Sequence, residues 1–374
     1  MPKIALFQDY LAQYGGAERV TEAIHRALPE ADLHTTLSVP EKMSPYLRKL
    51  DAKTTWMQWL PAKSKLYRHY FLFYPFAVES VDLESYDLVV SSCCGYAKGV
   101  KRGKNAIHVC YCHNPMRWVW RFQEYMAREK FNAPTKSILG TMVRGLKWWE
   151  TKAAQRPDYF IANSHIVARR LRSAFGIEAA VIEPPIETSR FWISKNIDDY
   201  YLVLSRLVAY KRIDLAVEAC TRTGRRLLVI GDGPDRERLK AMAGPTVTFL
   251  GRQPDRAVNR YASRCRALIF PGEEDFGMAP LEINAAGRPV VAYGAGGATE
   301  TVLEQVNGIL FREQTLEALI EALDRFEYRV WDPLTIRRIA RRYDIHLFQE
   351  RFLDFLSTVS PMMREYRLLR RRAG

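Results

Sequence analysis

Short apolar runs alternate with longer stretches of helical periodicity along most of the chain. The apolar runs of the first half predict strands at Ile4–Gln8, Leu33–Val39, Leu88–Ser92, Ile107–Cys112, Tyr159–Asn163 and Ala179–Ile182. The periodic stretches predict helices over Ala17–Leu28, over Ser137–Gln155 and from the capping residue Ser164 to Phe175, before Gly176. Because strands that alternate with helices form parallel sheets covered on both faces, this pattern predicts an α/β fold.

The segment EPPIETSRFWISKNIDD, Glu183–Asp199, interrupts the alternation with two prolines and several polar residues, which is typical of a linker. After it the alternation resumes, with strands predicted at Tyr201–Ser205, Leu227–Ile230, Val247–Leu250, Ala267–Phe270 and Val290–Tyr293. Helices are predicted between them at Ile213–Thr221, Asp235–Ala243, Asp255–Arg264 and near Ala279–Ala286. We therefore expect two doubly wound, Rossmann-like domains with a cleft between them.

Composition is consistent with a two-domain protein of the cytoplasm. With 374 residues, 48% of them hydrophobic, the chain is long enough for two cores. Its six cysteines show no paired CxxC spacing, so we expect them to be small buried apolar residues in a reducing compartment. The longest stretch without a charged residue, Asn105–Met116, is shorter than the roughly 20 residues of a membrane-spanning helix. The apolar run at the N-terminus is also too brief for a signal peptide.

The net charge of +14 is unevenly distributed. Residues 1–190 hold 27 Lys and Arg against 18 Asp and Glu, and residues 356–374 add five Arg against one Glu. Residues 191–355 carry an excess of only one positive charge. The positive charge is therefore concentrated in one part of the protein, which indicates a partner for that part.

The stretch QYGGAERV places Gly15 and Gly16 between the first predicted strand and the first predicted helix. Glycines at this position allow close approach of the backbone to a ligand, and the free N–H groups of a helix start attract an anion. A tight turn from strand to helix explains the two glycines equally well. The stretch matches neither GxGxxG nor the P-loop pattern, which weakens dinucleotide and P-loop readings.

Two cations and a glycine-rich turn follow strands of the second half. In LSRLVAYKRID, Arg206 and Lys211 come at the end of a predicted strand and the start of a helix. Ligands of open parallel sheets bind at the carboxyl ends of the strands, where two cations could hold a diphosphate. A solvated pair is the alternative. The turn Gly231-Asp232-Gly233 either carries a nucleotide or merely ends its strand.

The stretch EEDFGMAPLEIN places two acids around the start of another helix. Glu274 lies in the loop after the strand Ala267–Phe270, and Glu282 falls in the first two turns of the helix. Acids near a helix N-terminus are often only partners of the helix dipole. At the carboxyl edge of a sheet they could instead bind the hydroxyls of two sugars, a ribose and the sugar carried by its nucleotide. The turn GAGGATE, Gly294–Glu300, would bring further N–H groups to this edge.

These features together resemble the retaining glycosyltransferases of family 4, over essentially the whole chain. Glu274 and Glu282 match the E-x7-E motif of that family, and Arg206 and Lys211 match its diphosphate-binding pair. Gly15-Gly16 matches its N-terminal glycine loop. The resemblance implies the GT-B fold, with an acceptor-binding domain of residues 1–190 and 356–374, whose C-terminal helix crosses back, and a nucleotide-sugar-binding domain of residues 191–355.

The run HVCYCHNPMRWVW, His108–Trp120, is similar to bacterial O-antigen and exopolysaccharide mannosyltransferases that use GDP-mannose. The resemblance implies that His113 contacts the donor sugar, although a histidine at a strand end is often structural. It further implies that Arg206 and Lys211 neutralise the leaving diphosphate, that Glu274 holds the donor sugar and that Glu282 holds the ribose. The same donor site would include Gly15, Gly16, Gly231, Asp232, Gly233, Phe276, Gly277, Met278 and Ala279.

We expect no metal and no other cofactor. The chain has no D-x-D triplet, the sequence with which metal-dependent transferases of the GT-A fold hold a divalent ion. In the resemblance, Arg206 and Lys211 take over the role of that ion. The expected partners are a sugar nucleotide and a saccharide or lipid-linked saccharide of cell-surface polysaccharide synthesis, such as lipopolysaccharide.

The basic surplus suits reversible contact with the anionic cytoplasmic face of the inner membrane. We expect cations such as Lys98, Lys101, Arg102 and Arg370–Arg372 to dock there. Six aromatic residues lie among the cations of this half: Trp118, Trp120, Phe122, Tyr125, Trp148 and Trp149. Trp148 and Trp149 are equally consistent with a position in the core.

Three other functions remain open. The enzyme could use a UDP- or dTDP-sugar, because sugar choice changes with few residues. A GT-B-like sugar-nucleotide epimerase is less favoured, because it would need neither the E-x7-E loop nor a basic acceptor face. Nucleic-acid binding is also disfavoured, since no motif of that class occurs in the chain.

Overall fold

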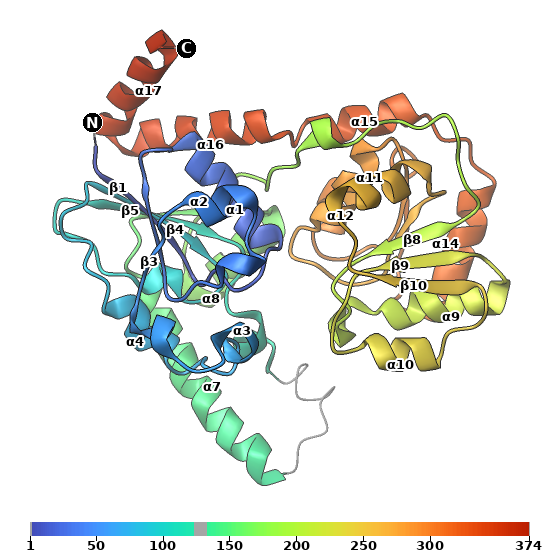
Figure 1. Ribbon diagram of the computed structural model, residues 1–374, viewed down its shortest axis with the longest axis horizontal. Helices are drawn as coiled ribbons and strands as arrows, with labels where there is room; N and C mark the ends of the chain where they lie inside the picture. Colours follow the sequence, from blue (N-terminus) through green and yellow to red (C-terminus); the bar gives the residue numbers. More distant parts are fainter. Residues whose placement is uncertain (1, 123–132, 374) are drawn as a thin grey trace. The chain divides into compact units, whose positions relative to one another are not determined.

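The computed structural model describes residues 2–122 and 133–373. The chain forms two compact units (Figure 1). Unit 1 consists of Met1–Glu183 and Phe348–Gly374, and unit 2 consists of Pro184–Leu347. Among the described residues, no helix is both long enough and apolar enough to cross a membrane.

Unit 1 contains a parallel sheet whose order, in the described part of the chain, is β3-β2-β1-β4-β5-β6-β7. Its strands are β1 (Ile4–Gln8), β2 (Asp32–Thr35), β3 (Lys53–Thr54), β4 (Leu88–Cys93), β5 (Ile107–Cys112), β6 (Tyr159–Ala162) and β7 (Ala180–Val181). Strand β1 pairs with β2 on one side and with β4 on the other, so the direction of strand succession reverses between β1 and β4. Open parallel sheets bind ligands at the carboxyl ends of strands beside such a reversal.

The helices of unit 1 cover both faces of this sheet. They are α1 (Gly16–Ala27), α2 (Pro45–Lys49), α3 (Lys63–Leu66), α4 (Tyr74–Glu79), α5 (Arg117–Trp120), α7 (Ala133–Ala153), α8 (His165–Phe175) and the C-terminal α17 (Pro361–Ala373). Phe7 of β1 shares one core cluster with Val143 of α7. The predicted caps of α8 are confirmed, because Ser164 Oγ accepts from Val167 N at 3.2 Å and Gly176 has a φ of 70°.

Unit 2 contains a second parallel sheet, ordered β10-β9-β8-β11-β12-β13 within the described residues. Its strands are β8 (Tyr201–Leu204), β9 (Leu227–Ile230), β10 (Val247–Gly251), β11 (Leu268–Phe270), β12 (Val290–Tyr293) and β13 (Gly308–Phe311). Its helices are α9 (Ile213–Thr223), α10 (Arg236–Ala241), α11 (Asp255–Arg264), α12 (Met278–Ala285), α13 (Ala298–Thr301), α14 (Leu316–Glu327) and α15 (Pro333–Arg341). Helices α9 and α14 bury one face, and α11 and α12 bury the other (Figure 1). The predicted doubly wound α/β architecture is therefore confirmed in each unit.

The units divide earlier than the boundaries expected from the sequence, 190/191 and 355/356. Ile186 forms a parallel bridge with Asp344, and the predicted linker belongs to unit 2 from Pro184 onward. Helix α16 (Ile345–Val359) begins in unit 2 and continues in unit 1 from Phe348. Phe348 lies against Tyr111 of β5, with ring centroids 5.9 Å apart. The boundaries follow these side-chain contacts, which the proline-rich composition of the linker does not reveal.

Candidate functional site

The candidate site of unit 2 lies at the carboxyl ends of β8 and β11. These two strands are neighbours in the sheet, although two other strands and three α-helices separate them in the sequence. The loop after β8 carries Arg206 and continues into a 3₁₀ turn that ends at Lys211. The loop after β11 carries Glu274 and ends where α12 begins. The reversal of strand order between β8 and β11 therefore brings these loops to the same edge.

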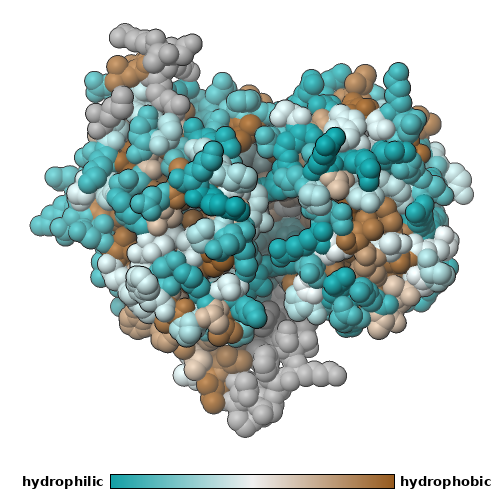
Figure 2. Space-filling model, viewed as in Figure 1, coloured by the Kyte–Doolittle hydropathy of each residue, from teal (hydrophilic) through white to brown (hydrophobic). Residues whose placement is uncertain are grey.

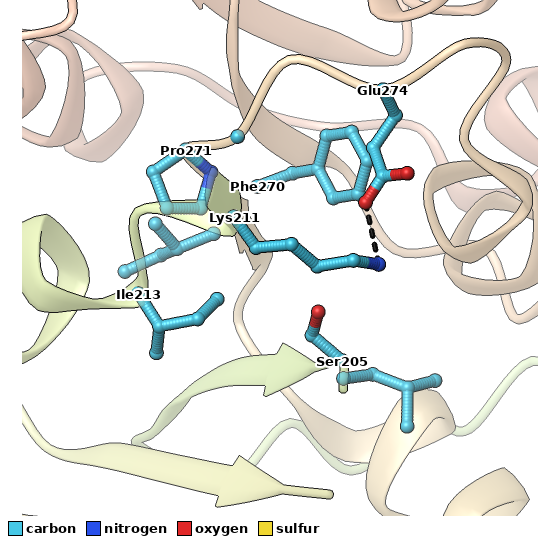
Figure 3. Close-up of a pocket in the computed structure, with 9 residues that line it drawn as sticks. Ser205, Lys211, Ile213, Phe270, Pro271 and Glu274 are labelled. Atoms are coloured by element: carbon cyan, nitrogen blue, oxygen red, sulfur yellow. Dashed lines mark ion pairs between the residues drawn. The ribbon is translucent and has the colours of Figure 1, made fainter. Parts of the chain in front are cut away.

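Lys211 and Glu274 form an ion pair at this edge (Figure 3). Lys211 Nζ lies 2.5 Å from Glu274 Oε1, and the two side chains are only 19% and 17% exposed. Burial alone would lower the pKa of Lys211, but the adjacent Glu274 carboxylate outweighs it and raises this pKa above its ordinary value. Lys211 is therefore a fixed positive charge, held beside a carboxylate with little solvent around either group.

Arg206 lies on the same loop with its side chain exposed. Its positive charge acts on Lys211 in the direction opposite to Glu274, so the two cations are within electrostatic reach of each other. In the described part of the chain, Arg206 takes part in no ion pair. The edge therefore offers one exposed cation beside a partly buried, paired one.

A small pocket opens beside the ion pair (Figure 3). It is lined by Leu204, Ser205, Lys211, Ile213, Ile269, Phe270, Pro271, Gly272 and Glu274. The pocket has about 210 Å³ of free space, including its open mouth. Drug-sized ligands occupy pockets of roughly 300–1,000 Å³. This pocket by itself is therefore large enough for only one part of a sugar nucleotide.

The glycine-rich turn after β12 holds the loop that carries Glu274. Gly297 N donates to the Glu274 carbonyl oxygen at 2.8 Å. A Cβ on Gly296, whose φ is 65°, would lie 2.2 Å from that same oxygen. The turn lies at the expected edge, but this N–H group is already used within the protein. Gly296 is required for close packing against the Glu274 backbone, and Gly297 is required for close packing against the Phe276 backbone.

The turn Gly231-Asp232-Gly233 packs in the same way against the loop that carries Arg206. A Cβ on Gly231, whose φ is 137°, would lie 1.8 Å from Ser205 O, and one on Gly233 would lie 2.1 Å from Leu207 O. Leu207 N donates to Asp232 O at 3.0 Å. The structure therefore supplies a packing reason for both glycines.

The predicted donor residues around α12 have different environments. Phe276 is 3% exposed and packs in the core, so its side chain does not face a ligand. Gly277 caps α12 with a φ of 84°, and Met278 and Ala279 form the first turn. Glu282 lies in the second turn and is partly exposed. Met278, Ala279 and Glu282 are therefore partly exposed, whereas the Phe276 ring is buried.

At the corresponding edge of unit 1, Gly15 caps α1 beside a buried carboxyl group that the sequence analysis missed. Gly15 N donates to Glu18 Oε2 at 2.8 Å, and Glu18 is 1% exposed. Burial raises the pKa of Glu18 to about 7. An acid three residues after a helix cap is half of a capping box, and this spacing could have identified Glu18. The N–H group of Gly15, which we expected to be free for an anion, is therefore occupied in this structure.

His113 follows β5 and ends a chain of buried polar groups. Its Nε2 lies 3.0 Å from Ser92 Oγ, which in turn lies 2.9 Å from the hydroxyl of Thr21. Thr21 donates to Gln8 at 2.6 Å, so the network joins β1, α1, β4 and β5. Burial lowers the pKa of His113 to about 4, which keeps the ring neutral at pH 7. The network fixes the ring in place and gives it a structural role at the end of the strand.

Asp9 is a second buried acid at this edge that the sequence analysis missed. Its carboxylate accepts from the backbone N–H groups of Cys94, Tyr96 and Ala97 at 2.7, 2.9 and 2.5 Å. These hydrogen bonds shape the loop after β4.

Of the cysteines expected to be buried, Cys94 is exposed and the other five are buried and free.

The prediction that Lys98 faces a membrane is wrong. Its side chain is fully buried, and its Nζ lies 2.7 Å from Glu150 Oε1. Glu150 also accepts from Trp120 Nε1 at 2.8 Å. Lys101 pairs with Glu79 and Arg102 with Asp158, so these cations are engaged within the protein as well. The side chains of Arg370–Arg372, and Tyr125 of the predicted aromatic group, lie outside the described residues.

Two protein-family models match consecutive parts of the chain. "Glycosyltransferase Family 4" matches residues 14–190, and "Glycosyl transferases group 1" matches residues 187–329. Together they span both edges described above, from Gly15 to beyond Glu282.

Curated relatives match parts of their own length. The human alpha-1,3/1,6-mannosyltransferase ALG2 is 25% identical over 285 residues, covering 65% of this chain and 65% of the relative. A GDP-mannose-dependent alpha-(1-6)-phosphatidylinositol monomannoside mannosyltransferase of Mycolicibacterium smegmatis is 29% identical over 192 residues, covering 43% and 50%. Glycogen synthase of Pseudomonas aeruginosa is 30% identical over 145 residues, covering 36% and 28%. The chain thus spans less than two thirds of the length of each of these relatives.

Solved structures share the fold over almost the whole chain. Anabaena HepE in complex with UDP and glucose has a TM-score of 0.69 at 18% identity, covering 96% of this chain and 100% of the other. Sucrose-phosphate synthase of Thermosynechococcus elongatus has a TM-score of 0.72 at 18% identity, covering 96% and 99%. At this level of identity the likeness establishes the fold.

Proposed function

Since the chain belongs to the family 4 glycosyltransferases with the GT-B fold, we propose that it is a retaining hexosyltransferase that moves mannose from GDP-mannose to an acceptor saccharide. The observation that carries this proposal is the Lys211–Glu274 ion pair at the carboxyl edge of unit 2. The choice of mannose is supported by the run His108–Trp120 and by the two mannosyltransferases among the relatives.

The residues at this edge have different roles in the proposed transfer. Negative charge develops on the diphosphate as the bond to the sugar breaks, and Lys211 and Arg206 neutralise it. Charge stabilisation of this kind is usually the largest single contribution to catalysis. Glu274 accepts hydrogen bonds from hydroxyls of the donor sugar, and Glu282 accepts them from the ribose. The proposed contacts of Gly15, Gly16 and His113 with the donor stay predictions.

The acceptor is a saccharide or lipid-linked saccharide of cell-surface polysaccharide synthesis, bound by unit 1 at the cytoplasmic face of the inner membrane. The concentration of positive charge in residues 1–190 and 356–374 supports this assignment. Unit 2, which is nearly neutral in sequence, binds the donor.

Calorimetry of the purified protein with GDP-mannose, UDP-glucose and a dTDP-sugar tests the donor. We expect GDP-mannose to bind most tightly and to be hydrolysed slowly when no acceptor is present. Clearly tighter binding of UDP-glucose would replace the mannose assignment with a UDP-hexose transferase, the alternative favoured by the solved HepE complex with UDP-glucose. Conversion of GDP-mannose to another GDP-sugar would show an epimerase instead. Proton NMR of the product tests whether the anomeric configuration is retained.

A further inference from the structure

A row of aromatic side chains is exposed on unit 1 between β3 and α4. Trp56, Trp59, Phe73 and Phe76 are 43%, 87%, 46% and 70% exposed. Soluble proteins rarely leave large apolar side chains together at the surface unless a partner covers them. Brown and teal residues lie side by side on the face over α3 and α4 (Figure 2).

Local geometry places these four residues, the aromatic row, on one surface. Trp56 and Trp59 are the first and last residues of a 3₁₀ turn, in which side chains three residues apart eclipse each other. Phe73 caps α4 and Phe76 follows three residues later, so these two share a face of the helix. The rings of Trp56 and Phe73 meet edge to face with centroids 6.1 Å apart, which joins the two pairs.

The segment of the chain that carries the aromatic row contains cations but no acidic residues. From Ala52 to Val78 the chain has no Asp or Glu, but it has three Lys and one Arg. Lys65 and Arg68 are exposed beside Leu66, which is itself 39% exposed. Across the described residues, neither Lys65 nor Arg68 forms an ion pair. Lys53 pairs with Asp32, so Lys65 and Arg68 are the cations that give this apolar surface a positive charge not neutralised by an ion pair among the described residues.

We propose that the aromatic row, with Lys65 and Arg68, is the surface on which the enzyme docks reversibly on an anionic phospholipid membrane. Tryptophan and phenylalanine rings favour the boundary between head groups and acyl chains, and cations are attracted to anionic lipids. Charge complementarity favours a membrane over a second copy of this chain, because two copies would bring the same cations together. The docking surface thus lies between β3 and α4, away from the buried Lys98.

Two hydrogen bonds connect this surface to the loop after β1, at the carboxyl edge of the unit 1 sheet. Tyr67 Oη and Arg68 Nη2 donate to Gln13 Oε1 at 3.0 and 2.8 Å, and Gln13 lies two residues before Gly15. Docking would hold the carboxyl edge of the sheet close to the bilayer. If the proposed function is right, a lipid-linked acceptor then reaches that edge without leaving the membrane.

Flotation with vesicles of phosphatidylcholine, with and without phosphatidylglycerol, tests the proposal on the full chain. We expect binding to anionic vesicles that weakens between about 0.1 M and about 1 M salt, as the Debye length falls from about 10 Å to about 3 Å. The pair Trp59→Ala and Phe76→Ala should weaken this binding at least about tenfold. Lys65→Gln should weaken it about fivefold.

Matched controls lie on the same unit. Trp148→Ala removes an aromatic ring that is 61% exposed on α7, and Lys101→Gln removes a cation that is paired with Glu79. Both should bind vesicles as the wild type does. Vesicles with brominated acyl chains should quench the tryptophan fluorescence of the wild type and of Trp148→Phe, and quench that of Trp59→Phe less.

Three results would overturn the proposal. Loss of binding or of quenching with the α7 variants alone would assign docking to α7. Dimers in sedimentation velocity that Trp59→Ala abolishes, without any vesicle binding, would show a protein interface. Absence of vesicle binding by the wild type would exclude membrane docking altogether. Calorimetry with GDP-mannose separates these results from a failure of the proposed function, because the Trp59 and Phe76 variants should bind donor normally.

Discussion

Lys211 Nζ and Glu274 Oε1 lie 2.5 Å apart because the strands that precede them, β8 and β11, are neighbours in a parallel sheet. Neither charge has much solvent around it, so each stabilises the other. In the proposed function, the positive charge that binds the diphosphate is thus held in place before any donor arrives. A donor would bring its phosphates and sugar hydroxyls to groups that are already oriented.

Removal of one partner of this ion pair should affect activity and stability differently. Lys211→Met or Glu274→Gln should raise the barrier to transfer by about 2–4 kcal/mol, since each group acts where charge or hydroxyls must be held. Each single change should also lower the free energy of unfolding by about 1–3 kcal/mol, because it leaves the other charge partly buried and unpaired. The double variant should regain much of that stability without regaining activity. Initial rates and urea unfolding measure the two effects.

Lys240→Met provides the matched control for this cycle. Lys240 pairs with Glu237 at 3.8 Å on an exposed surface of α10. Its loss should change unfolding by less than about 0.5 kcal/mol and leave the rate unchanged. Wild-type activity in a folded Lys211 or Glu274 variant would remove that residue from the site.

Gly231→Ala should be strongly destabilising. A Cβ at this position would lie 1.8 Å from Ser205 O, and the φ of 137° is itself unfavourable for alanine. The free energy of unfolding should fall by about 3–5 kcal/mol. Gly224→Ala is the control, because Gly224 has a φ of 69° but open space around it, and should cost only about 1–2 kcal/mol. Equal losses in urea unfolding would mean that contact with the Ser205 loop is not what requires glycine.

Stability should depend on pH through Glu18. Its folded pKa of about 7 lies above the ordinary value of 4.5, so the folded state binds the proton more tightly than the unfolded chain does. This contribution, about 3 kcal/mol at most, is fully present below pH 4.5 and is lost as the pH rises to about 7. Glu18→Gln keeps an acceptor for Gly15 N without the charge, so its stability relative to the wild type should grow over that window. Urea unfolding at several pH values tests this, with the exposed Glu41→Gln as control. The same pH dependence in both variants would contradict the assignment to Glu18.

Transfer activity should survive treatment with a chelator. In the proposed site, the fixed charge of Lys211 and the exposed charge of Arg206 face the diphosphate, so no divalent ion is needed there. We expect most of the activity to remain after dialysis against EDTA. Complete loss that Mg²⁺ or Mn²⁺ restores would show that the two cations do not suffice.

The sequence by itself determined the elements whose signal is local. The bounds of β1, β5, β9, β12 and α11 agree with those predicted, because strands buried on both faces appear as unbroken apolar runs and α11 has regular helical periodicity. Helix α14 could also have been predicted, since Thr315 caps it and its apolar residues recur at helical spacing. The order of motifs placed Lys211 and Glu274 at strand ends, and the family resemblance assigned both to one donor site. Their contact depends on the adjacency of β8 and β11, which the sheet order decides.

Only the tertiary structure decided which charges are buried and which aromatic residues are exposed. Lys98 looks like a surface cation in the sequence, but Glu150, far along the chain, pairs with it in the core. Phe276 lies in a loop next to the site, yet its ring packs against the core of unit 2. Trp59 has an apolar side chain and is nevertheless 87% exposed. Whether a residue is buried depends on segments distant in the sequence that pack against it. Those contacts exist only in the folded chain.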